Sequence, residues 1–237
     1  MKTRLYAAGI MAGLAILAVT MFAIFEFGRK HPSPPSLEDH PNPAIAGQLL
    51  FVDRDSCFIQ ADASGASRVK RACFPGSLNS PQMFWPSNDE AAVVRHDSRG
   101  GVLFTIDLNN GTQQDTGRAV SVDIWKPGPG GYGGGNFAPD GTYGFAEPGG
   151  DLFVIVQGVR TKVASFDVPK YEQPQVLIWS PDSQWMVLSY YPHRSDGPEL
   201  WIVGRDGKTK GTLARDLAPA SGVAWRMDGL PTQPPMP

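Results

Sequence analysis

The sequence carries little charge and no cluster of basic residues. Charged side chains make up 19% of the 237 residues, and the formal net charge is -2. Proteins that bind nucleic acid use basic patches to neutralise phosphates, whereas the Lys and Arg residues here are scattered along the chain. We therefore expect no nucleic-acid partner.

The sequence also lacks the short motifs of common enzymes. It contains no Gly-x-Ser-x-Gly elbow, P-loop, His-Glu-x-x-His pair or EF-hand loop. Its two cysteines have no His or further Cys at the spacing of a zinc site. We expect no cofactor, and the sequence leaves the presence of a metal open.

A composition that favours helices is absent as well. The chain contains 27 Gly and 22 Pro, which end helices, together with 12 Phe, 6 Trp and 6 Tyr, which suit the pleated surface of a sheet. These residues predict an all-β domain.

One long apolar run is present, at the amino terminus. Residues 5–25 contain no charge, and a helix of that length matches the roughly 30 Å hydrocarbon core of a bilayer. We predict a membrane anchor over residues 1–30, in preference to a cleaved signal peptide, because no clear small-x-small cleavage site follows the run. Basic residues flank the run on both sides and leave its orientation nearly open.

Five prolines follow the apolar run within residues 31–46. Proline resists both helix and sheet, so this stretch is predicted to be an extended linker that acts as a stalk.

An aromatic residue followed by a turn element occurs four times in the remaining chain. The four copies begin at Trp85, Phe137, Trp179 and Trp225, at spacings of 52, 42 and 46 residues. Apolar runs follow, as at 143–146 and 152–156, and Asn-Gly or Asp-Gly pairs supply hairpin turns. Each unit therefore predicts four strands.

These units resemble the WD40-like repeats of TolB-type β-propellers, with the best match at 137–141 and 179–182. The resemblance implies a propeller over residues 47–230, followed by a disordered tail over residues 231–237, and it implies protein interaction in the cell envelope. The run at 47–52 has no aromatic turn before it, and the run at 223–225 has nothing after it. If these two runs pair, the last strand completes the first sheet and four blades result. Two chains forming an eight-bladed ring is the alternative, and would make a homodimer.

Cys57 and Cys73 lie symmetrically about Gly65. In a hairpin centred on Gly65 the two residues are directly opposite, which permits a disulfide. A disulfide implies an oxidising compartment, so we expect the C-terminal domain to lie outside the cytoplasm, in a periplasm or at the cell surface. Two buried thiols in the cytosol are the alternative.

Loops between the second and third strands of propeller blades open on one face, and here these loops carry polar residues. The candidate ligand-binding residues are Asp53, Asp55, His96, Asp97, Arg99, Glu147, His193 and Asp196. Carboxylates and imidazoles suit a cation, and arginine suits an anionic group. Hairpin loops are also polar simply because they face water.

Two hypotheses of function follow. The first is a non-enzymatic binding module whose partner is an envelope protein or a cell-wall component. The second is a metal-dependent enzyme or sensor that uses the loops around His96 and His193.

Overall fold

The computed structural model describes residues 33–74, 82–97, 100–120, 135–192, 197–218 and 222–235. The predicted anchor, residues 1–30, lies outside these ranges. Within the described ranges no helix has the length and apolar character needed to cross a bilayer.

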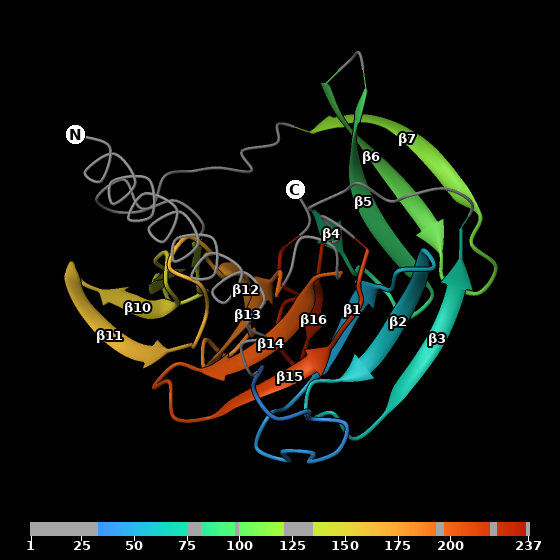
Figure 1. The fold of residues 1–237 in the computed structure, drawn as a ribbon. Helices are drawn as coiled ribbons and strands as arrows, with labels where there is room; N and C mark the ends of the chain where they lie inside the picture. The colour runs from blue at the N-terminus through green and yellow to red at the C-terminus, as the bar shows by residue number, and fades with distance from the viewer. Residues whose placement is uncertain are drawn as a thin grey trace, which may run out of the picture. The chain divides into compact units, whose positions relative to one another are not determined.

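The described residues form sixteen strands in four antiparallel sheets of four strands each (Figure 1). In sheet 1 the strands are, in spatial order, β16 (Ala224–Arg226), β1 (Gln48–Val52), β2 (Cys57–Asp62) and β3 (Arg68–Cys73). Sheet 2 contains β4 (Met83–Phe84), β5 (Glu90–Asp97), β6 (Gly100–Asp107) and β7 (Gln113–Val120). Sheet 3 contains β8 (Asn136–Phe137), β9 (Tyr143–Ala146), β10 (Asp151–Val156) and β11 (Val159–Ser165). Sheet 4 contains β12 (Gln175–Trp179), β13 (Trp185–Tyr190), β14 (Glu199–Gly204) and β15 (Lys210–Ala214).

The all-β prediction is confirmed, and four such sheets are consistent with a small propeller. The predicted pairing of the chain ends is also confirmed, because β16 pairs with β1 through Leu49 opposite Trp225. Sheet 1 is thus built from both ends of the domain, which ties the last strand to the first by main-chain hydrogen bonds.

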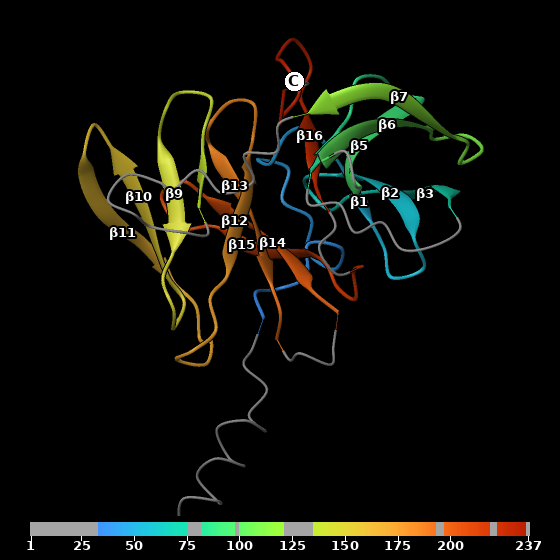
Figure 2. The ribbon, with the colours of Figure 1, turned by 90° about the horizontal axis from the view of Figure 1, so that it is seen from above.

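Alternating side chains on the strands build cores between neighbouring sheets. Sheets 3 and 4 share a cluster that includes Leu152 and Trp179. Sheets 4 and 1 share one that includes Ile202 and Trp225, and sheets 1 and 2 share one that includes Trp85. Figure 2 shows sheet 3 together with β12 and β13 on one side of β16, and β1, β2, β3, β5, β6 and β7 on the other.

The predicted linker is not a free stalk from residue 33 onward. Leu37 and Ile45 are buried in the core shared by sheets 4 and 1, and the Ala46 carbonyl accepts a hydrogen bond from the Trp225 indole. In its described part, residues 33–46, the stretch forms turns and a single bridge, from Ser36 to Thr212. The prediction was wrong because apolar residues between the prolines bury surface against the sheets.

The tail predicted to be disordered is also partly ordered. Trp225 and Gln233 exchange two main-chain hydrogen bonds, at 2.7 and 2.8 Å. Residues 231–235 therefore fold back beside β16, and the prediction of disorder is wrong for them.

Candidate functional site

The loops between the second and third strands of the sheets carry most of the predicted site residues. The structure describes the turn at 53–56 in sheet 1, the turn at 147–150 in sheet 3, and part of the loop at 191–198 in sheet 4. His96 and Asp97 end β5, where they pair with Gly101 and Gly100, but their side chains lie outside the described set. Arg99, His193 and Asp196 also lie outside the described residues.

Asp53 shapes its own turn. One of its carboxylate oxygens accepts a hydrogen bond from the Cys57 amide at 2.8 Å, and its main chain closes the turn around Ser56, which has a positive φ of 61°. This cap explains why an aspartate stands here, since a short carboxylate can satisfy an amide that the turn leaves free.

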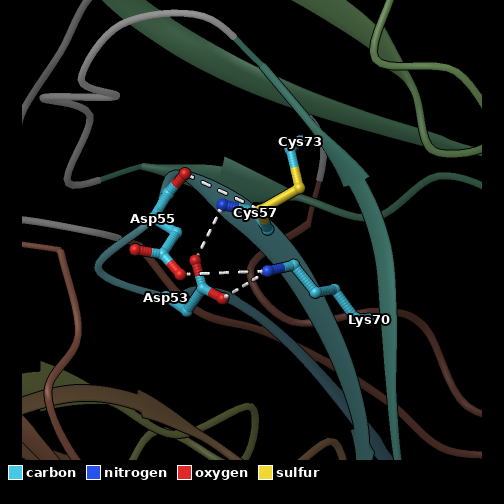
Figure 3. The surroundings of a disulfide bond; sticks show 5 residues. All are labelled: Asp53, Asp55, Cys57, Lys70 and Cys73. Carbon is cyan, nitrogen blue, oxygen red and sulfur yellow. Dashed lines mark hydrogen bonds and ion pairs between the residues drawn. A yellow bond between two sulfur atoms is a disulfide. The ribbon is translucent and has the colours of Figure 1, made fainter.

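Lys70 contacts two predicted site residues, Asp53 and Asp55 (Figure 3). Its ammonium nitrogen is 3.7 Å from an oxygen of Asp53 and 3.9 Å from an oxygen of Asp55. The positive charge offsets the repulsion between the two carboxylates. The structure therefore brings Asp53 and Asp55 together around a lysine that sequence reasoning did not select.

The disulfide between Cys57 and Cys73 stands directly beside this pair of carboxylates (Figure 3). The two cysteines are opposite one another in the hairpin of β2 and β3, and Gly65 turns that hairpin with a φ of +85°. The predicted pairing is confirmed. Phe74, the next residue, packs on Phe58 with ring centroids 5.4 Å apart.

Glu147 belongs to a second polar group, in sheet 3. Its carboxylate is 2.8 Å from the Arg160 guanidinium, which also lies over the Phe153 ring. The neighbouring Asp151 accepts hydrogen bonds from Lys162 and from Ser165, which hold the pKa of Asp151 below its ordinary value. Glu147 and Asp151 thus each contact a cation supplied by β11.

A third polar group, absent from the sequence prediction, connects sheet 4 to the loop before it. The Tyr190 hydroxyl donates to Glu172 at 2.6 Å, and the Trp201 indole donates to the buried Glu199 at 2.8 Å. Burial is the main cause that raises the pKa of Tyr190. The hydrogen bond to Glu172 and the negative charges of Glu172 and Glu199 raise this pKa further. Tyr190 therefore stays protonated and acts as a donor. No local motif could have indicated this, because Glu172 and Tyr190 meet only through packing.

The loop at 166–173 is braced against the turn at 147–150. The Gly149 amide donates to the Glu172 carbonyl at 2.9 Å, the Phe166 amide donates to Gly150, and the Gln173 side chain donates to the Ala146 carbonyl. At the tip of this braced loop Tyr171 is 86% exposed. The hydrogen-bonded loop therefore displays a large aromatic side chain to solvent.

The described residues contain no group of three or more His, Cys, Asp or Glu side chains that could hold a metal ion. What the described loops offer chemically is a surface of paired charges with an exposed tyrosine.

Comparison with known proteins gives distant structural matches. No family model matches the sequence, and no curated protein matches it. Among solved structures, TolB from Acinetobacter baumannii is 14% identical over 81% of this chain and 50% of its own, with a TM-score of 0.28. A prolyl endopeptidase is 13% identical over 73% of this chain and 30% of its own, with a TM-score of 0.28.

YCF48 bound to D1 peptide is 12% identical over 70% of this chain and 49% of its own, with a TM-score of 0.25. TolB and YCF48 are β-propeller proteins. The chain spans about half the length of these two proteins and less than a third of the endopeptidase chain.

Proposed function

We propose that this protein is a membrane-anchored, extracytoplasmic β-propeller that acts as a protein-interaction module of the cell envelope. The partner we propose is an envelope protein, in preference to a cell-wall component. The observation that carries the proposal is the tyrosine displayed on the braced loop at 166–173.

Tyr171 has the properties of an interface anchor. Tyrosine is enriched at protein interfaces because it offers a large apolar ring and a polar tip, and loses little rotamer entropy on binding. Leaving such a ring 86% exposed gains nothing for folding. The hydrogen bonds that brace its loop lower the cost of ordering the loop when a partner binds.

The disulfide supports the proposed compartment. Disulfides persist in oxidising compartments and are rare in the reducing cytosol. The anchor at residues 1–30 would then leave the domain on the outer side of the membrane.

Site-specific cross-linking tests the interaction. A photoreactive amino acid replaces Tyr171 in the full-length chain in cells. The matched control places the same amino acid at Lys208, whose side chain is 85% exposed in the hairpin between β14 and β15. We expect a discrete protein adduct from position 171 and none from position 208. Equal yields from both positions, or no adduct from 171, would refute the use of this loop.

Thiol labelling tests the compartment. Cells are lysed into denaturant that contains a maleimide-polymer reagent, with or without prior reduction. A disulfide formed in the cell predicts a mass shift of Cys57 and Cys73 only after reduction. Labelling without reductant contradicts the extracytoplasmic placement.

A further inference from the structure

The last strands of the four sheets differ in how they meet solvent. Most side chains of β3, β7 and β11 are exposed, and charged residues such as Lys70, Arg118 and Lys162 stand on them. Exposed charge on an outer strand discourages pairing with other chains. In contrast, four of the five residues of β15, Gly211 to Ala214, are buried.

The segment at 33–38, which we call the strap, covers β15. In Figure 1 it belongs to the dark blue stretch below β15. Ser36 forms a parallel bridge with Thr212, which is only 3% exposed. Thr212 binds the strap three times: its amide donates to the Pro35 carbonyl at 2.8 Å, its hydroxyl donates to the Pro34 carbonyl at 2.7 Å, and its carbonyl accepts from the Leu37 amide at 2.9 Å.

Two glycines make room for Leu37. A Cβ atom at Gly211 would lie 2.5 Å from the Leu37 side chain, and one at Gly65 would lie 2.3 Å from the Leu37 carbonyl oxygen. Leu37 is 4% exposed and belongs to the same core cluster as Leu213. The groove between β15 and the hairpin of β2 and β3 is therefore shaped for a leucine.

The hydrogen-bond pattern matches the chemistry of proline. Pro34 and Pro35 have no amide proton to donate. Each of them contributes only its carbonyl, as a hydrogen-bond acceptor for Thr212. The first amide that the strand requires is that of Leu37. Adding an extended segment to a sheet edge through main-chain hydrogen bonds, with a pocket for one side chain, is a general mode of peptide recognition.

We propose that this groove is a peptide-recognition site for an extended Pro-Pro-Ser-Leu segment, occupied in cis by the chain's own residues 34–37. The occupant in trans is the same segment of a second copy, which every copy carries with matching chemistry. Exchange of identical segments is a low-cost route to a dimer. At low protein concentration the chain's own strap occupies the groove in preference to the strap of a second copy, because its covalent attachment gives it a high effective concentration.

A peptide-binding experiment on the full-length chain in detergent tests this site. The probe is a fluorescent peptide of residues 33–40, and the receptor variants are Leu37→Asp and the milder Leu37→Ala, both of which weaken the cis strap. We expect the peptide to bind either variant at least about tenfold more tightly than wild type, because its competitor has been weakened.

Two controls define the groove. A peptide in which Asp replaces Leu37 should not bind. Adding Gly211→Val to the Leu37→Ala receptor should abolish binding of the unmodified peptide, because the valine side chain fills the space that the leucine side chain occupies. If Leu37→Asp unfolds, Leu37→Ala with an intact disulfide and a native circular dichroism spectrum decides the matter. Equal weak binding to wild type and to a folded Leu37→Ala receptor, or binding that survives Gly211→Val, overturns the proposal. Cross-linking at Tyr171 can fail without affecting this result, since the two sites share no residue.

Discussion

Trp179 and Phe137 occupy the same position in neighbouring repeats, yet their surroundings differ sharply. Trp179 is 1% exposed, packs in the core between sheets 3 and 4, and donates its indole proton to the Asn136 carbonyl at 3.0 Å. Phe137 is 47% exposed and contacts Tyr143, with ring centroids 4.8 Å apart. Trp85 and Trp225 resemble Trp179 in being fully buried.

The difference follows the interfaces between sheets. Three pairs of sheets share an apolar core, but among the described residues no such core joins sheet 2 to sheet 3. The remaining described clusters each lie within one of these two sheets. The aromatic residue that begins a repeat is thus a core residue only where the preceding sheet packs against it.

The largest effect is expected from Trp179→Ala. The substitution empties a space in the core between sheets 3 and 4, so the free energy of unfolding should fall by about 3 to 5 kcal/mol. Denaturant unfolding of the full-length chain in detergent measures this. A loss as small as that of Phe137→Ala would break the comparison.

Removing the disulfide is expected to have the next largest effect. Cys57→Ser with Cys73→Ser frees the hairpin that leads into Phe74, a residue of the core between sheets 1 and 2. The chain-entropy model gives a loss of about 3 kcal/mol for a loop of this size. The matched control is wild type with and without reductant, and a double variant as stable as oxidised wild type would contradict the prediction.

The ion pair between Asp140 and Arg205 should add a small, pH-dependent term to the interface of sheets 3 and 4. Burial acts to raise the pKa of Asp140, but hydrogen bonds from Thr142 and Arg205 outweigh it and leave the pKa below its ordinary value of 3.8. The stabilisation is therefore present above that value and is lost as the pH falls through the lower folded-state pKa.

The pair is partly exposed, so its contribution should stay under about 1 kcal/mol. Comparing wild type with Asp140→Asn at pH 6 and pH 3 should show a difference in unfolding free energy at pH 6 that shrinks at pH 3. A difference that grows on acidification has the wrong sign and would contradict this account.

The smallest effect is expected from Phe137→Ala. A half-exposed ring has little burial to lose, so the unfolding free energy should change by about 0.5 kcal/mol. The same denaturant titration measures it beside Trp179→Ala. A loss above about 2 kcal/mol would show that Phe137 is a core residue of an interface between sheets 2 and 3.

Much of the local structure could be predicted. Strands at 143–146 and 152–156 were expected from short apolar runs and lie in β9 and β10. The hairpin turn at Gly111, with a φ of +76°, follows from an Asn-Gly pair that tolerates this conformation. The predicted site was harder, because Lys70 and Arg160 reach its loops from β3 and β11.

The sequence by itself determined the number and spacing of the strands, the pairing of the chain ends and the opposition of Cys57 and Cys73. The strand spacing and the opposition of the cysteines depend on short-range periodicity and turn chemistry, which act within a few residues, whereas the pairing of the chain ends was inferred from the complementary runs at 47–52 and 223–225. Only the tertiary structure decided that the strap binds β15, that Phe137 stays exposed while Trp179 is buried, and that Tyr171 stands on a braced loop. Each of these depends on which distant surface lies opposite, and a local pattern carries no information about that surface.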